Sequence, residues 1–259
     1  NNVYGEAADF NDYVRKGHAL DYDGTRAMFE AFRVNTPVST GIVQWMLNSA
    51  WPSLYWQLYD YYGVPCAAYY GTKKACEPIQ LIYNYKDGHV YLVNEGLYEG
   101  DVEVAVKVYD DASALLGEQS KTVRTSYRNN VDAFDMTVYA GKPHFIALEV
   151  KCKDGKVIAD NFYCIAAERN VYDWDNYTWY DTPIKKHSDL RFAFAQPEAE
   201  VAMETSYADG VYTVTLKNDS DVVSYMNILK AKDAEGNLVV PAYWSDNFFA
   251  LLPGQTKTI

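Results

Sequence analysis

The sequence predicts a multidomain α+β protein, in which an α-β-α segment precedes two immunoglobulin-like antiparallel β-sandwiches. Up to about residue 77, apolar residues recur at helical spacing on both sides of one short apolar run. Beyond it they alternate with polar residues at period two. At 259 residues the chain is long enough for two domains or more. We therefore divide it into residues 1–77, 78–186 and 187–259.

The first expected element is a helix over residues 11–33. Its apolar residues recur at spacings near three and four, which is a helical stripe. The stripe consists of Tyr13, Val14, Leu20, Met28, Phe29 and Phe32. Asn35-Thr36-Pro37 follows and ends the helix.

A short strand and two further helices are expected next. The strand is GIVQWML at residues 41–47. The helices cover residues 55–62 and 67–77, with Gly63-Val64-Pro65 between them and Pro78 after the second. This order matches one and a half units of a TIM barrel, which would be a helix, an apolar strand that ends in Trp and Asn, and a second helix. A whole barrel needs roughly 250 residues, so residues 1–77 are interpreted as a piece of one.

After residue 77 the pattern predicts β-strands. Three runs each place their apolar side chains on one face: Val102, Val104, Val106 and Val108; Ile146, Leu148, Val150 and Cys152; Tyr212, Val214 and Leu216. Turn pairs separate the strands at Asp87-Gly88, Asp154-Gly155, Asp209-Gly210 and Glu235-Gly236. One such sandwich takes roughly 100 residues, so we expect two, divided within the aromatic segment at residues 170–190, with the second incomplete at its last strand.

Composition excludes several classes of function. The net charge of -12 opposes binding to nucleic acid and mildly favours a cationic ligand, although an acidic solubilising surface explains the same charge. No apolar run approaches the ~20 residues of a membrane span. The four cysteines lack metal-ligand spacing and are expected to be free thiols. Asp173, Asp175 and Asn176 lack the glycine and glutamate that complete a calcium loop. We therefore expect no metal and no cofactor.

The segment at residues 44–65 concentrates aromatic rings and side-chain amides, a combination that suits a sugar. Trp45 is the candidate floor under a sugar ring, Asn48 a candidate partner of a hydroxyl, and Trp51 a candidate stacking ring at the rim. The alternatives are a barrel-core tryptophan, a turn-capping asparagine and a ring packed on the following helix. The later rings are assigned to packing between barrel and sandwich: Tyr55, Trp56, Tyr59, Tyr61 and Tyr62.

Residues 41–80 are similar to the last barrel strand and exit helix of glycoside hydrolase family 2, above all to its exo-β-D-glucosaminidases, with β-mannosidases and endo-β-mannosidases as relatives. The matching features are Trp-x-x-Asn-x-x-Trp-Pro at 45–52, Asp-Tyr-Tyr at 60–62 and Lys-Lys-Ala-x-Glu-Pro-Ile at 73–79. Residues 9–32 resemble the preceding barrel helix, residues 161–183 the end of the first C-terminal sandwich, and residues 243–259 the final domain.

The resemblance implies retaining hydrolysis of β-linked glucosamine, or mannose, from chain ends of an oligosaccharide. In that family the acid/base and nucleophile carboxylates end the fourth and seventh barrel strands, and this chain is expected to begin after both. No catalytic residue is therefore assigned here. Glu6, Asp9 and Asp60 are interpreted as solvent-exposed or capping acids.

The expected partners are the upstream barrel and sugar-binding domains of the same polypeptide. The localisation stays open, with a periplasmic or secreted location favoured over a cytoplasmic one. The competing hypothesis is a non-catalytic carbohydrate-binding or structural β-sandwich module.

Overall fold

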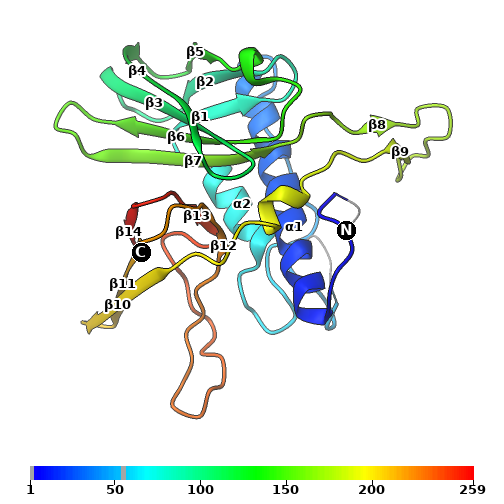
Figure 1. Ribbon diagram of the computed structural model, residues 1–259, viewed down its shortest axis with the longest axis vertical. Coiled ribbons are helices and arrows are strands. Elements are labelled where there is room, and N and C mark those ends of the chain that lie inside the picture. The colour runs from blue at the N-terminus through cyan, green and yellow to red at the C-terminus, as the bar shows by residue number, and fades with distance from the viewer. Residues whose placement is uncertain (1–2, 54–56) are drawn as a thin grey trace.

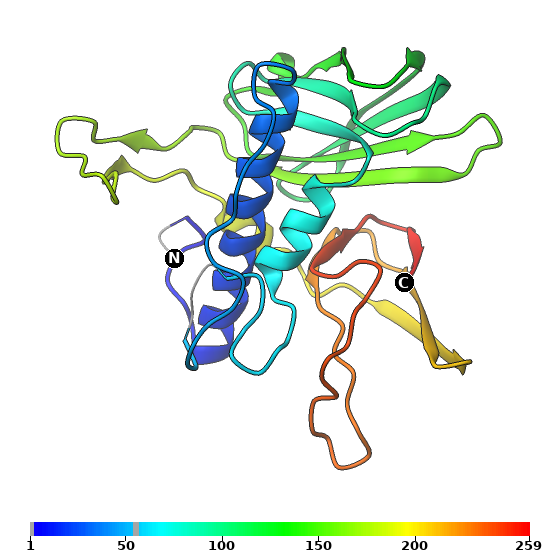
Figure 2. The same cartoon turned by 180° about the vertical axis from the view of Figure 1, so that it is seen from behind.

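The computed structural model describes residues 3–53 and 57–259, and most of its regular structure is antiparallel β-sheet (Figure 1). Its two α-helices are α1 (Phe10–Val34) and α2 (Ala67–Ala75). Short 3-10 turns lie at Thr137–Tyr139 and Arg191–Phe194. The helices lie side by side in both views; α2 lies below the larger sheets, whereas the longer α1 continues upward alongside them (Figures 1 and 2).

Two antiparallel sheets pack face to face over residues 79–165. One has the order β1-β2-β5, with β1 (Ile79–Asn84), β2 (His89–Asn94) and β5 (Asn129–Asp135). The other has the order β4-β3-β6-β7, with β3 (Gly100–Asp110), β4 (Leu115–Thr125), β6 (His144–Lys151) and β7 (Val157–Ile165). Val102, Val104, Val106 and Val108 are all buried in the core between them, which confirms the period-two prediction.

The C-terminal part holds two smaller sheets and an arm. The arm is the hairpin of β8 (Val171–Tyr172) and β9 (Ile184–Lys186), which reaches away from the body in both views (Figures 1 and 2). One sheet has the order β10-β11-β14, with β10 (Val201–Ala208), β11 (Val211–Asn218) and β14 (Thr256–Thr258). The other pairs β12 (Ser224–Asn227) with β13 (Phe249–Leu251). The boundaries proposed at residues 77/78 and 186/187 stay predictions.

The turn pairs are where the sequence predicts them. Gly88, Gly155, Gly210 and Gly236 all have φ between 80° and 86°, which favours glycine because its missing Cβ removes the steric penalty. Among the described residues, Cys66, Cys76, Cys152 and Cys164 are free thiols.

Helix α1 forms where it is predicted, but its apolar stripe does not face the sandwich. Asp9 caps the helix by accepting a hydrogen bond from the Asp12 N–H at 2.8 Å. Four stripe residues are between 41% and 49% exposed: Tyr13, Leu20, Met28 and Phe32. The buried face instead carries long polar side chains, with Arg26 1% and Glu30 2% exposed.

A polar cluster joins this buried face to β7. The guanidinium of Arg26 donates to Asn161 Oδ1 at 3.0 Å and to Asp23 Oδ1 at 2.8 Å. Glu30 Oε1 accepts from Asn161 Nδ2 at 2.8 Å and from the Tyr163 hydroxyl at 2.9 Å. Burial raises the pKa of Glu30 although Arg26 opposes it. The helix is thus fixed to the sheet by specific hydrogen bonds as well as by packing.

Two predictions in the expected barrel segment are wrong. Residues 41–47 form no strand: the backbone is irregular, and Val43, Trp45 and Leu47 are 90%, 75% and 60% exposed. A strand needs a neighbour for its backbone groups, and no described residue pairs with residues 41–47 as a strand. Residues 57–62 are not helical either, since Leu58 and Tyr59 instead donate to the Leu47 carbonyl at 3.0 Å.

The remaining predicted positions of that helix include Tyr55 and Trp56, which lie outside the described residues. Helix α2, in contrast, begins at Ala67 and ends before Pro78, as predicted. The structure therefore confirms both flanking helices, but it does not confirm a barrel segment.

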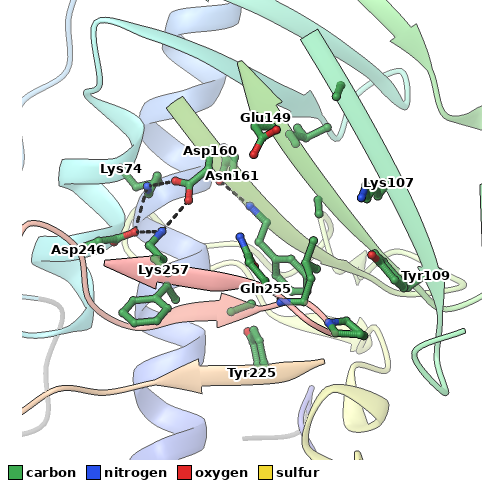
Figure 3. A pocket seen from close by; sticks show the side chains of 18 of the residues that line it. Lys74, Lys107, Tyr109, Glu149, Asp160, Asn161, Tyr225, Asp246, Gln255 and Lys257 are labelled. Atoms are coloured by element: carbon green, nitrogen blue, oxygen red, sulfur yellow. Dashed lines mark hydrogen bonds and ion pairs between the residues drawn. The ribbon is translucent and has the colours of Figure 1, made fainter. Parts of the chain in front are cut away.

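Four charged side chains form a closed ring where α2, β7 and the C-terminal sheets meet (Figure 3). Lys74 Nζ lies 2.6 Å from Asp160 Oδ1 and 3.3 Å from Asp246 Oδ2. Lys257 Nζ lies 2.6 Å from Asp160 Oδ2 and 2.7 Å from Asp246 Oδ2. Burial alone would raise the pKa of Asp160, but Lys74 and Lys257 hold it well below its usual value. We call these four residues the charge ring.

We expect Asp160→Asn to lower the free energy of unfolding at pH 7 by about 2–3 kcal/mol, because it leaves Lys74 and Lys257 facing each other with one carboxylate between them. This is below the ~3–5 kcal/mol of a fully buried pair because the Asp160 side chain is 35% exposed. The measurement is urea unfolding, with Asp219→Asn as the control. Asp219 pairs with Lys217 on the surface, so its loss should cost less than ~1 kcal/mol.

The difference in free energy of unfolding between wild type and Asp160→Asn should depend on pH. Because the pKa of Asp160 is lower in the folded state, its stabilising effect is complete above the unfolded pKa of ~3.9 and disappears as pH falls through the folded value. The gap between wild type and Asp160→Asn should therefore shrink below about pH 4. Equal losses for Asp160→Asn and Asp219→Asn would contradict a stabilising ring.

Candidate functional site

The aromatic segment lies between the two helices. The chain leaves the end of α1, runs back along that helix and loops before it enters α2 (Figure 2). Isolated backbone bridges join Asn48 to Tyr59, and Tyr59 to Pro65. The Ser49 hydroxyl donates to Gln57 Oε1 at 3.1 Å, and both residues are buried. These contacts hold the loop in one folded-back shape.

The three predicted site residues lie on the outer side of this loop. Trp45 and Trp51 are 75% and 69% exposed, so both present flat ring faces. The peptide bond between Trp45 and Met46 is cis. Asn48 is exposed, and its Nδ2 donates to the Ser49 carbonyl at 3.2 Å, so its side chain engages the turn as well as facing solvent.

Two of the acids expected to have structural roles do so. Asp9 caps α1, as described above. Asp60 Oδ1 accepts from the backbone N–H groups of Tyr62 at 2.8 Å and Val64 at 2.9 Å, and so closes the turn around Gly63, whose φ is 79°. Glu6 is exposed, and its carbonyl accepts from Lys16 Nζ at 2.7 Å.

A groove of about 780 Å³ lies beside the three predicted residues. One wall is the N-terminal half of α1, the second comes from residues 49–53 and 57–66, and the third is the long connection between β12 and β13, residues 228–248. Ser49 and Pro52 line it, and these residues are chain neighbours of Asn48 and Trp51. Trp45, Asn48 and Trp51 themselves are not among the lining residues, so the predicted site and the groove adjoin without coinciding.

The charged residues of the groove come from separate elements. Asp21 and His18 belong to α1, Asp60 to the second wall and Lys230 to the third. Burial raises the pKa of Asp21 to about 6. Burial lowers the pKa of His18, and Lys230 lowers it further, so this imidazole is neutral at pH 7. Sequence reasoning missed Asp21, His18 and Lys230, and no local motif marks them, because only the fold brings them together.

A second cavity, of about 390 Å³, lies between the outer face of the β3-β6-β7 sheet and the C-terminal sheets (Figure 3). Its charged lining includes the charge ring, and Lys107 and Lys151 pair with Glu118 and Glu149. These charges are paired within the chain, and the cavity lies where the first sandwich contacts the C-terminal sheets.

Among residues 3–53 and 57–259, no group of three His, Cys, Asp or Glu side chains is arranged to hold a metal ion. Over the same ranges, neither helix combines the length and the apolar character that crossing a membrane requires.

The chain is similar to known glycosidases over nearly its whole length. Residues 179–259 match the family model of the exo-β-D-glucosaminidase Ig-fold domain. The exo-β-D-glucosaminidase of Hypocrea jecorina is 33% identical over 96% of this chain, and that of Amycolatopsis orientalis 32% over 99%. The mannosylglycoprotein endo-β-mannosidase of Lilium longiflorum is 21% identical over 99% of this chain. The chain spans 30%, 26% and 32% of the lengths of these relatives.

Solved structures agree with these sequence matches. The crystal structure of the Amycolatopsis orientalis exo-chitosanase superposes with a TM-score of 0.89 at 30% identity, and covers 98% of this chain and 32% of its own. The β-D-mannosidase of Dictyoglomus thermophilum reaches a TM-score of 0.74 at 19% identity, covering 99% of this chain and 28% of its own, and so shares the fold. The chain is therefore homologous to part of the exo-β-D-glucosaminidases, consistent with the C-terminal portion of glycoside hydrolase family 2, and its residues 179–259 match the Ig-fold domain of those enzymes.

Proposed function

We propose that this chain is the C-terminal part of a retaining glycoside hydrolase that removes β-linked glucosamine from the non-reducing ends of oligosaccharides. The observation that carries the proposal is the difference in identity between the two kinds of relative. Identity is 31–33% to exo-β-D-glucosaminidases and 21% to an endo-β-mannosidase, each over at least 96% of the chain. The net charge of -12 also favours a cationic polymer over a neutral one.

In this proposal Trp45, Asn48 and Trp51 are the residues that the chain contributes to the sugar site. The exposed ring of Trp45 offers the apolar floor on which a pyranose stacks, and Trp51 offers a second ring at the rim. The side-chain oxygen of Asn48 is available to accept a hydrogen bond from a sugar hydroxyl while its Nδ2 holds the turn. These residues bind and orient the sugar, and none of them transfers a proton.

The two carboxylates that retaining hydrolysis needs are assigned to other parts of the protein. Such a pair lies about 5–5.5 Å apart across the glycosidic bond. Two of the acids that the sequence puts in this region are already engaged: Asp9 caps α1 and Asp60 closes a turn. We therefore place neither the acid/base nor the nucleophile among residues 1–259.

The exposed apolar face of α1 is assigned to contact with the rest of the same polypeptide. Met28 and Phe32 are exposed on the C-terminal half of the helix, outside the groove, and Val43 and Leu47 are exposed on the segment that runs back along it. Large apolar surfaces of this kind are rare on monomers and mark interaction sites. A barrel built by the remaining polypeptide would cover them.

We expect the intact parent enzyme to have a higher kcat/KM on β-linked glucosamine disaccharides than on β-linked mannose disaccharides. The acidic surface attracts the protonated amines, and salt screens this attraction. The ratio of kcat/KM for the glucosamine substrate to that for the mannose substrate should therefore fall as salt rises from low to moderate concentration. The measurement is kcat/KM for both substrates at two ionic strengths. A preference for the mannoside at both would refute the assigned sugar.

The purified 259-residue chain alone should release no nitrophenol above buffer from a panel of aryl β-glycosides, because the proposal places both carboxylates elsewhere. The control is the intact parent under the same conditions. Turnover by the chain that survives repurification would contradict this assignment.

In the intact parent, Trp45→Ala should lower kcat/KM by at least ~100-fold, which corresponds to about 2.7 kcal/mol of transition-state stabilisation. The matched control is Trp179→Ala, which removes a ring that is 93% exposed on the β8–β9 arm and should change kcat/KM less than ~3-fold. A Trp45→Ala enzyme that melts at a lower temperature and keeps near-normal kcat/KM would show that this ring is structural.

A further inference from the structure

The groove beside the predicted sugar site has the dimensions of a ligand site and walls that are already fixed. Its volume of about 780 Å³ lies within the range of small-molecule pockets. The third wall is held at both ends. Asn247 Oδ1 accepts from Leu229 N–H at 2.8 Å, and Asn247 Nδ2 donates to Leu229 O at 3.0 Å. Lys73 Nζ donates to the Trp244 carbonyl at 2.8 Å, which ties this wall to α2. These bonds fix the base of the third wall before a ligand binds, which lowers the entropic cost of binding there.

The second wall of the groove offers aromatic rings to a ligand. Tyr61 and Tyr62 are 51% and 64% exposed, and their ring centroids lie 5.2 Å apart in an edge-to-face arrangement. The carboxylate of Asp60 fixes the backbone of this turn, so the rings stand on a rigid base. Exposed rings on a fixed backbone suit stacking on the apolar face of a sugar.

The first wall carries an acid that has no cation of its own. Asp21 is half-buried and lines the groove, and no hydrogen bond or ion pair joins it to any residue that the structure describes. Burial is the only cause that shifts its pKa, to about 6, so the carboxyl is ionised at neutral pH. The other charged and titratable groups that line this groove include His18, Asp60 and Lys230. The thiol of Cys66 lines it too, on the second wall. A partly desolvated carboxylate of this kind is stabilised by a ligand that brings a positive charge.

The groove also adjoins the predicted sugar site along the chain. Ser49 and Pro52 line it, and each is next to a residue of the predicted sugar site, Asn48 and Trp51 respectively. A polymer whose end is held at Trp45 would have its following sugars close to this groove.

We propose that this groove is a second carbohydrate-binding site, which holds a β-linked glucosamine oligomer with an ammonium group against Asp21 and sugar rings against Tyr61 and Tyr62. The identity of the sugar rests on the proposed function, whereas the groove, its rings and its unpaired acid are features of the chain itself.

The test is binding of a glucosamine hexamer to the 259-residue chain by isothermal titration calorimetry at pH 7 and low salt. The fully N-acetylated hexamer is the matched ligand, because it keeps the rings and removes the charge. We expect the glucosamine hexamer to bind at least ~5-fold more tightly than its acetylated form. Asp21→Asn should remove that advantage while leaving the acetylated hexamer unaffected, since a charged hydrogen bond is worth at least this much. Tyr61→Ala should weaken both ligands at least ~3-fold, because stacking does not depend on the amine.

The control variant is Glu204→Gln, which removes an exposed acid on β10 and should change neither affinity. Thermal melting of each variant checks that it folds. Tyr61→Ala changes an exposed residue, so it still tests the site if Asp21→Asn is unstable. Equal losses from Asp21→Asn and Glu204→Gln would show general attraction to an acidic surface and overturn the proposal. Equal affinity of the wild-type chain for both hexamers would also overturn the proposal, and so would the absence of binding of either hexamer. The measurement needs no hydrolysis, so an intact parent without glucosaminidase activity would contradict the proposed function and leave this result standing.

Discussion

The charge ring is the interaction on which the relative positions of the helices, the first sandwich and the C-terminal sheets depend. Lys74 comes from α2, Asp160 from β7, Asp246 from the connection before β13 and Lys257 from β14. Each lysine lies between two aspartates, and Glu77 lies 3.1 Å from Lys74 as a third partner, so every charge of the ring has at least two partners of opposite sign. Asp246 is two residues from Trp244, which binds α2 through Lys73. The ring therefore also fixes the wall of the groove that faces the aromatic loop.

The sequence predicted those parts of the fold whose pattern lies within one element. A strand such as β3 reveals itself because Val102, Val104 and Val106 alternate with polar residues, whatever the strand pairs with. The turns at Gly88 and Gly155 are equally local. The buried face of α1 was not predictable in this way. A stripe at helical spacing identifies apolar positions, but here Arg26 and Glu30 face the sheet because Asn161 and Tyr163 supply the hydrogen bonds that they need.

The residues of the candidate site were likewise predictable only where the pattern lies within one segment of the sequence. Trp45 and Trp51 were found because a dense run of rings is visible in the sequence itself. Asp21 and Lys230 have ordinary neighbours in the sequence, and only the packing of the β12–β13 connection against α1 brings them to one groove. The predicted strand at 41–47 failed for the opposite reason. Its apolar composition is suitable, but strand structure also requires partners for its backbone, and the described residues supply none.

The placement of the indole rings has a spectroscopic consequence. Of the six tryptophans, Trp45, Trp51, Trp174 and Trp179 are between 66% and 93% exposed, and two of these stand on the β8–β9 arm. Trp244 is half-buried beside the groove. Intrinsic fluorescence of this chain therefore originates mostly at its surface, and its emission reports what covers that surface more than whether the core is folded.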